Sequence, residues 1–293
     1  MSRIHEALKR AERERGRADP PVARVQISAF DPIPEEAEVP SSFTPLTLES
    51  LQARSSKLTW NPDPHAQLTE QLDGDSPGAE EFRSLRSFLY LARQQRRLQR
   101  ILISSPLPRE GKSFTALNLA HAIARQPEHG ALLIDSDLRL PRLHAALGTN
   151  STPGLTEYLS SEADEFSILQ RGLIENLFFI PAGKSPSDPS ELIGNGRLKL
   201  LLDRLTPAVD WIILDSPPVL PVSDAKLLAE LCDAVILVVQ AGSTPYDLAR
   251  KACQQFRDKQ VLAVVLNRAA PNPAYSSYYH YNREDGRNHN GTG

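Results

Sequence analysis

The stretch ILISSPLPREGKSFTALNLA, residues 101–120, decides the fold. It joins a short apolar run, a loop that ends in Gly-Lys-Ser and an apolar helical pattern, with nothing between them. This order predicts a buried strand, a phosphate-binding loop and a helix whose N-terminus faces the loop. The sequence therefore predicts a nucleotide site between the first core strand and the helix after it.

The loop, residues 104–113, carries the groups that phosphates need. Backbone N–H groups in the 110–113 segment form an anion-binding nest at the helix N-terminus. Lys112 can reach the β- and γ-phosphates of ATP, and the Ser113 hydroxyl can ligate Mg²⁺. Pro106, which replaces the usual first glycine of the motif, and Pro108 have no N–H. We therefore expect phosphate contacts in the second half of the loop.

Apolar runs and helical patterns alternate through the rest of this region. The expected strands are residues 100–104, 131–135, 177–181, 211–215, 234–239 and 261–266. The expected helices are residues 79–97, 113–125, 190–205, 223–231 and 245–257. This alternation predicts an α/β fold, a mostly parallel sheet with helices on both faces. Ligands of such sheets bind at the carboxyl ends of the strands.

Two of these strands end in acidic residues. Asp135 and Asp137 follow the second apolar run, with Arg139 two residues later, so two carboxylates and a guanidinium are expected where phosphates would lie. Asp215 ends a later run, as in a Walker B element, and is expected to hold the Mg²⁺ shell through water. Carboxylates near Mg²⁺ are what phosphoryl transfer requires.

The sequence outside the core divides into three segments. Residues 1–16 form a short basic amphipathic pattern, either a solvated helix or a docking helix for a partner or an anionic membrane face. Residues 17–78 are proline-rich and predict a disordered or loosely packed linker before a domain at 79–270. Residues 271–293 predict a flexible tail. Four of the chain's seven tyrosines stand in it: Tyr275, Tyr278, Tyr279 and Tyr281.

Composition narrows the class of protein. A net charge of −3 gives no bulk reason to expect nucleic-acid binding. Cys232 and Cys253 form neither a disulfide framework nor a metal-ligand spacing, which suits a reducing compartment. No apolar run approaches the roughly 18 residues of a membrane-spanning helix, and the first residues do not form a signal peptide. We expect a cytoplasmic protein.

Together these motifs resemble the bacterial tyrosine kinases of polysaccharide export, which share a P-loop scaffold with the ParA and MinD ATPases. The match covers roughly residues 78–281, and the family's Pro-Gly-Glu-Gly-Lys-Ser/Thr loop stands here as PREGKS, with Arg109 in place of glycine. The resemblance implies that Asp137 activates the tyrosine hydroxyl. It implies these catalytic residues: Lys112, Asp135, Asp137 and Asp215. It implies these Mg²⁺-binding residues: Ser113, Asp135 and Asp215. It implies these ATP-binding residues: Glu110, Gly111, Lys112, Ser113, Phe114 and Asn267, the last beside adenine.

The resemblance also implies an assembly and a pathway. Glu80, Arg83 and Arg86, spaced by three on one side of the first domain helix, resemble a self-association motif. The implied kinase is a homo-oligomer such as a ring, and it phosphorylates its tail tyrosines in trans. Implied partners are a membrane chain-length or export protein that activates it at the inner face of the membrane, and a tyrosine phosphatase. The implied role is to regulate capsular or exopolysaccharide synthesis and export.

Two other functions remain open on sequence alone. A ParA- or MinD-like ATPase switch would hydrolyse ATP without transfer to tyrosine, although those relatives carry an extra lysine where this chain has Leu107. A nucleotide-binding regulatory module would bind ATP without turnover, if Pro106 and Arg109 have compromised the loop.

Overall fold

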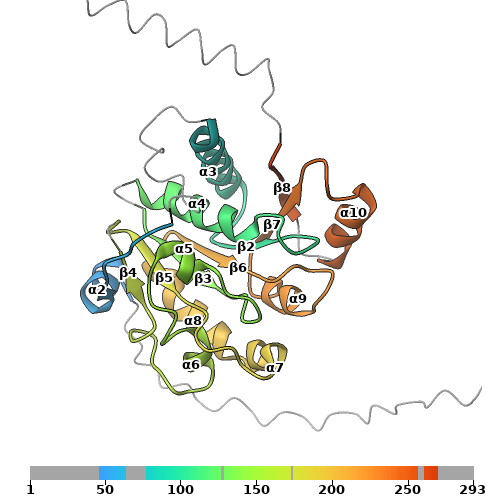
Figure 1. The fold of residues 1–293 in the computed structure, drawn as a ribbon. Helices are drawn as coiled ribbons and strands as arrows, with labels where there is room; N and C mark the ends of the chain where they lie inside the picture. The colour runs from blue at the N-terminus through green and yellow to red at the C-terminus, as the bar shows by residue number, and fades with distance from the viewer. Residues whose placement is uncertain (1–45, 64–76, 127–128, 173, 257–260, 270–293) are drawn as a thin grey trace, which may run out of the picture. The chain divides into compact units, whose positions relative to one another are not determined.

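The computed structural model describes residues 46–63, 77–126, 129–172, 174–256 and 261–269 of the 293-residue chain. One sheet runs through this part, in the order β1-β4-β5-β3-β6-β2-β7-β8 (Figure 1). Its strands are β1 (Ser56–Lys57), β2 (Arg100–Ser104), β3 (Ala131–Asp135), β4 (Gln170–Arg171), β5 (Leu177–Ile180), β6 (Trp211–Asp215), β7 (Ala234–Gln240) and β8 (Val261–Asn267). Neighbouring strands pair in parallel except β4 and β5, which are antiparallel. The predicted α/β fold is confirmed.

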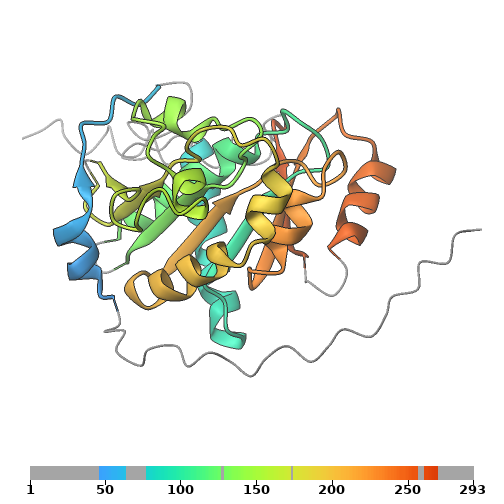
Figure 2. The ribbon, with the colours of Figure 1, turned by 90° about the horizontal axis from the view of Figure 1, so that it is seen from below.

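Helices cover both faces of the sheet (Figure 2). One face is packed by α3 (Pro77–Gln95), α4 (Lys112–Ala124) and α5 (Leu143–Leu147). The other is packed by α2 (Leu48–Arg54), α6 (Leu155–Leu159), α7 (Pro189–Gly194), α8 (Arg197–Leu205), α9 (Asp224–Ala229) and α10 (Tyr246–Gln255). A 3₁₀ turn, η1 (Thr206–Ala208), leads from α8 to β6. This layering buries the strands and leaves their carboxyl ends for a ligand.

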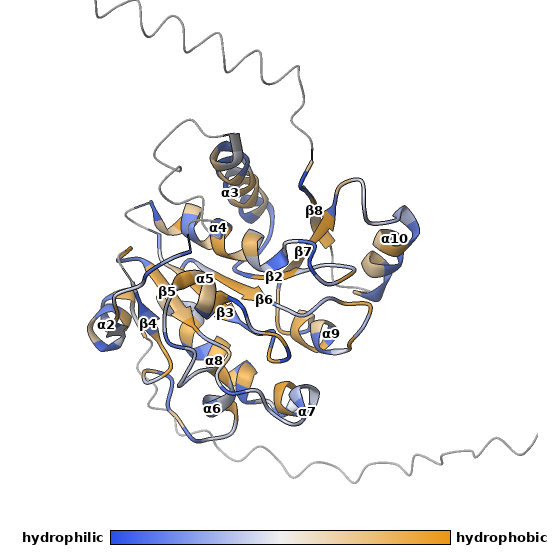
Figure 3. Ribbon diagram, in the orientation of Figure 1, coloured by the Kyte–Doolittle hydropathy of each residue, from blue (hydrophilic) through white to orange (hydrophobic). Residues whose placement is uncertain are grey.

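The central strands are mostly apolar up to their carboxyl ends because both of their faces are covered. Every residue of β3 and β6 is buried, and the strands at the centre of the sheet are mostly coloured as hydrophobic (Figure 3). Full burial of one large apolar side chain contributes about 1.5–3 kcal/mol. The acidic residues at the ends of β3 and β6 are therefore held on rigid elements.

The segment 46–63 corrects one expectation. Residues 17–78 were expected to form a linker without a core, but α2 buries Leu51 completely and β1 joins the sheet beside β4. The indole of Trp60 lies against Gly172 and meets the ring of Phe179 edge-on at 6.2 Å. The prediction was wrong for residues 46–63 because isolated apolar residues between prolines carry no periodicity.

The helix expected over 190–205 is broken into α7 and α8. Gly196, at the break, has a φ of +84°, a left-handed conformation that interrupts a helix and favours glycine. The other expected elements end within a few residues of the observed ones. The predicted N-terminal helix, residues 1–16, and the tail tyrosines lie outside the described residues.

Strand β8 ends the sheet. Among the described strands it pairs only with β7, and its side chains Val264 and Leu266 are 56% and 59% exposed.

None of the helices in the described ranges is long and apolar enough to cross a membrane.

Candidate active site

The phosphate-binding loop lies between β2 and α4, as the sequence predicts. Gly111, the residue before α4, has a φ of +98°. A Cβ added to it would come within 1.9 Å of Nδ2 of Asn267, from the end of β8. Both the backbone conformation and this close approach therefore require glycine at position 111.

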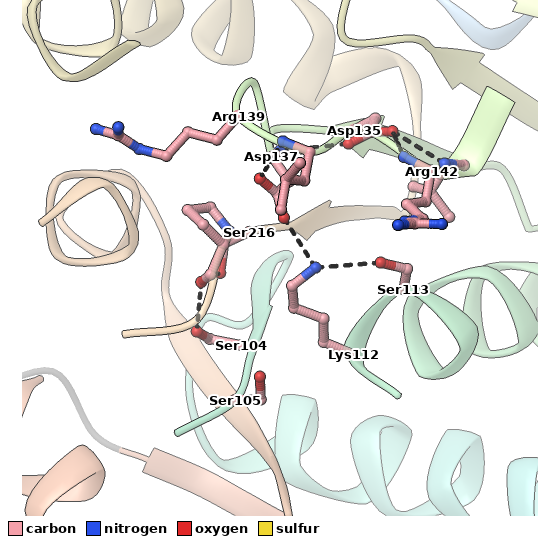
Figure 4. Close-up of polar contacts among 12 residues, drawn as sticks. Ser104, Ser105, Lys112, Ser113, Asp135, Asp137, Arg139, Arg142 and Ser216 are labelled. Carbon is pink, nitrogen blue, oxygen red and sulfur yellow. Dashed lines mark hydrogen bonds and ion pairs between the residues drawn. The ribbon is translucent and has the colours of Figure 1, made fainter. Parts of the chain in front are cut away.

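Lys112 points from the start of α4 toward the acidic strand ends (Figure 4). Its Nζ lies 2.9 Å from Oδ2 of Asp137 and 3.3 Å from the Ser113 hydroxyl. Burial by itself lowers the pKa of Lys112, but the nearby Asp215 and Asp137 carboxylates raise that pKa above its usual value. The lysine is thus a positive charge held among the groups that would surround phosphates.

Asp135 is completely buried at the end of β3. One of its oxygens accepts hydrogen bonds from the backbone N–H groups of Arg142, at 3.1 Å, and Leu143, at 3.0 Å. Burial, and then the charge of Asp215 opposite it on β6, raises the pKa of Asp135. The start of α5 therefore fixes the orientation of this carboxyl group.

Asp215 is also completely buried, and neither of its carboxylate oxygens accepts a well-formed hydrogen bond from the described residues. Burial raises its pKa, although Lys112 and the nearby Ser113 side chain act in the opposite direction. Two buried carboxylate oxygens that accept no well-formed hydrogen bond suit a cation. Asp215, Asp135 and the Ser113 hydroxyl thus fit a Mg²⁺ site.

Mg²⁺ in phosphoryl-transfer sites is usually bound by one or two carboxylates, water and substrate phosphates. Asp135 and Asp215 supply two such carboxylates, side by side on β3 and β6. Within the described part of the chain, no three His, Cys, Asp or Glu side chains are grouped to hold a metal unaided. When bound, the ion would neutralise charge on the phosphates.

Asp137 is held from two sides. Its Oδ1 accepts the backbone N–H of Leu140 at 3.1 Å, and its Oδ2 faces Lys112. The side chain is only 4% exposed. A carboxylate fixed in this way, next to the lysine that would bind phosphate, is placed to accept a proton from an incoming hydroxyl.

Arg139 is not at the mouth of the site, which corrects the sequence expectation. It points away from Lys112 (Figure 4) and makes a bidentate ion pair with Asp224 of α9, at 2.7 and 3.0 Å. It also donates to the Ser190 hydroxyl at 3.1 Å. Asp224 and Ser190 were not predicted from the sequence as partners of Arg139, since neither residue directly follows a strand.

Phe114 and Asn267, two other residues predicted to bind ATP, have defined contacts in the structure. The Phe114 ring packs edge-on against Phe82 at 5.9 Å on the α3 side of the sheet. The Asn267 side chain donates to the Glu110 carbonyl at 2.9 Å. Asn267 therefore borders the phosphate-binding loop.

The predicted self-association residues make contacts within their own chain. Arg83 pairs with Glu80 on the same helix at 2.7 Å. Arg86 donates to the carbonyl of Ala122 at 2.8 Å, near the C-terminal end of α4. Arg86 thus fastens α3 to α4, in addition to any contact with a second subunit.

A Gly-Lys-Ser loop at a helix N-terminus, with acidic residues on the neighbouring parallel strands, defines a P-loop nucleotide-binding protein. No protein-family model matches the sequence. Over 212 residues the chain is 32% identical to the tyrosine-protein kinase YwqD of Bacillus subtilis (strain 168), covering 72% of this chain and 89% of YwqD. It is 33% identical to the putative tyrosine-protein kinase EpsB of Ralstonia nicotianae (strain ATCC BAA-1114 / GMI1000), covering 70% of this chain but only 28% of EpsB.

Among solved structures, the chimerical protein CapA2B2 is 29% identical with a TM-score of 0.67, and the match covers 77% of this chain and all of that one. The chain belongs to the family of bacterial tyrosine-protein kinases.

Proposed function

We propose that this chain transfers phosphate from Mg²⁺-ATP to tyrosine, first to the tail residues Tyr275, Tyr278, Tyr279 and Tyr281. The observation that carries the proposal is the pairing of Asp137 with Lys112 at 2.9 Å, beside the buried Asp135 and Asp215. A hydrolytic switch needs the lysine and a Mg²⁺ ligand. A tyrosine kinase also needs a fixed carboxylate to receive the hydroxyl proton, and Asp137 meets that need.

The transfer acts in trans within a homo-oligomer such as a ring. The tail follows β8 in the sequence, and the half-buried Arg83–Glu80 pair on α3 offers charges to a second subunit. Several phosphates on each tail would repel one another and dissociate the assembly. Identical sedimentation of phosphorylated and unphosphorylated protein at matched concentration would rule out this switch.

The partners are part of the same proposal. The activator is a membrane chain-length or export protein that recruits the kinase to the inner face of the membrane, and a tyrosine phosphatase reverses the reaction. The pathway regulated is capsular or exopolysaccharide synthesis and export. Loss of co-purification with that membrane protein after deletion of residues 1–17 would assign the docking to the N-terminal segment.

The test is to incubate the purified chain with Mg²⁺-ATP, with and without the candidate activator, and to locate phosphate by mass spectrometry. Phosphate is expected on the tail tyrosines, and Lys112→Met is expected to abolish it. ATP hydrolysis with unmodified tyrosines, even with the activator present, would overturn the kinase proposal in favour of a ParA- or MinD-like switch. ATP binding with neither activity would favour a regulatory module.

A further inference from the structure

The Glu110 side chain is buried inside the phosphate-binding loop, with 3% of its surface exposed. One carboxylate oxygen accepts the backbone N–H of Leu107 at 2.7 Å. The other accepts a hydrogen bond from the hydroxyl of Thr244, in the turn between β7 and α10. A negative charge thus lies within a loop that must bind a polyanion, and two donors hold it.

Thr244 is itself fixed before any ligand arrives. Its backbone N–H donates to the carbonyl of Gln240 at 3.1 Å, and its hydroxyl oxygen accepts the backbone N–H of Gln240 at 3.2 Å. With that acceptor position used, the hydroxyl proton is free to be donated to Glu110. The end of strand β7 therefore determines where the Glu110 carboxylate lies.

The first half of the loop has few donors for phosphate. Pro106 and Pro108 have no N–H, and the N–H of Leu107 is taken by Glu110. Binding then depends on the N–H groups from residue 109 onward, where Glu110 stands. A Glu110 side chain released from Thr244 would set a carboxylate against phosphate in that half of the loop.

We propose that Thr244 is a positioning residue for Mg²⁺-ATP, which holds the Glu110 carboxylate away from the phosphates and keeps the loop in its binding conformation. The inference rests on the proposed function only in naming ATP as the ligand. Loss of the hydroxyl leaves a buried carboxylate oxygen of Glu110 without its donor, and the side chain avoids that penalty by turning outward. Loss of the Thr244 hydroxyl therefore weakens the binding of Mg²⁺-ATP and leaves the rate of the chemical step nearly unchanged.

The experiment compares Thr244→Val, which keeps the side-chain shape, with Thr244→Ser, which restores the hydroxyl, in the full chain. The control is Ser243→Ala at the adjacent exposed position. The Kd of Mg²⁺-ATP is measured by calorimetric titration, and KM for ATP and kcat by phosphotyrosine formation. Thr244→Val is expected to raise Kd and KM about tenfold with kcat within about twofold, whereas the serine and control variants bind as the unmodified chain does.

A second measurement separates positioning from general damage. In a Glu110→Ala background, Thr244→Val is expected to leave the Kd of Mg²⁺-ATP unchanged, because the carboxylate it controls is gone. An unchanged Kd in Thr244→Val alone, or an equal loss in both backgrounds, would overturn the inference. The Kd is measured without tyrosine transfer, so the two proposals can fail separately. A chain that binds ATP but labels no tyrosine would refute the proposed function, and the Kd values of the variants would still decide this inference.

Discussion

At the residue scale, Arg109 shows how this loop departs from its family pattern. Its φ of +67° lies in the left-handed region, and the family's loop motif has glycine at this position. A residue with a Cβ pays about 1–2 kcal/mol for that conformation. The loop keeps its glycine-type backbone although the glycine itself has been replaced.

Arg109→Gly is therefore expected to stabilise the chain slightly. Relief of the left-handed backbone exceeds the about 0.4–1 kcal/mol that glycine costs through the unfolded state, so the free energy of unfolding should rise by about 0.5 kcal/mol. Denaturant unfolding measures it. Lys251→Gly, exposed on the right-handed helix α10, is the control and should lower the free energy of unfolding by about 1 kcal/mol. Equal losses in both variants would contradict the explanation.

The crowded carboxyl groups predict how stability depends on pH. Burial raises the pKa of Asp135 to about 8 and that of Asp215 to about 6 in the folded chain, above the unfolded value near 3.8. The folded state then binds protons more tightly than the unfolded state, so stability falls as pH rises from about 4 toward 8.

In EDTA without nucleotide, the thermal midpoint of the unmodified chain should fall between pH 6 and pH 8. Asp135→Asn should flatten this fall and make the chain more stable at pH 8 by more than about 1 kcal/mol, because it removes one buried charge and its repulsion of Asp215. Glu175→Gln, at an exposed position, should keep the dependence of the unmodified chain. A midpoint that rises from pH 6 to pH 8 would refute this account.

At the scale of elements, the segment 46–63 is an integral part of the domain. Its residues Asn61 and Asp63 donate backbone hydrogen bonds to the carbonyls of Gly148 and Ala146, at 3.2 and 3.0 Å, around the C-terminal end of α5. The N-terminal end of α5 in turn orients Asp135. The segment thus supports the element that positions a predicted metal ligand.

Trp60→Ala should test that contribution. The change leaves a cavity beside Gly172 and Phe179 and should lower the free energy of unfolding by about 3–5 kcal/mol, as measured with denaturant. Leu91→Ala on α3, where the side chain is 61% exposed, is the control and should change it by less than about 0.5 kcal/mol. A loss as small as that of the control would mean that the segment is dispensable.

The strands and the loop could be predicted from sequence because buried parallel strands are continuous apolar runs, and the carboxyl ends of β3 and β6 bring Asp135 and Asp215 together. The side-chain partners could not. Nothing in the local pattern links Arg139 to Asp224, 85 residues away, or Glu110 to Thr244, 134 residues away. The Asn195-Gly196 pair was the available signal for the break between α7 and α8.

At the scale of the whole molecule, transfer in trans has a direct test. One chain carries Lys112→Met with its tyrosines intact, and the other is active but has phenylalanine in place of Tyr275, Tyr278, Tyr279 and Tyr281. Mixed with Mg²⁺-ATP, the Lys112→Met chain should gain phosphotyrosine at a rate that rises with the concentration of the active chain. Each chain alone is the control. A mixture that stays unlabelled while the unmodified chain labels itself would mean transfer in cis.

The exposed outer strand has a practical consequence for anyone preparing this protein. VLAVVL, residues 261–266, is uncharged and rich in β-branched side chains, and within the described sheet β8 has only one neighbour. Such an edge is a template for pairing with another chain and hence for aggregation at high concentration. Val264→Lys, which places a charge on the exposed side of this strand, would be the first change to make for crystallisation or long storage.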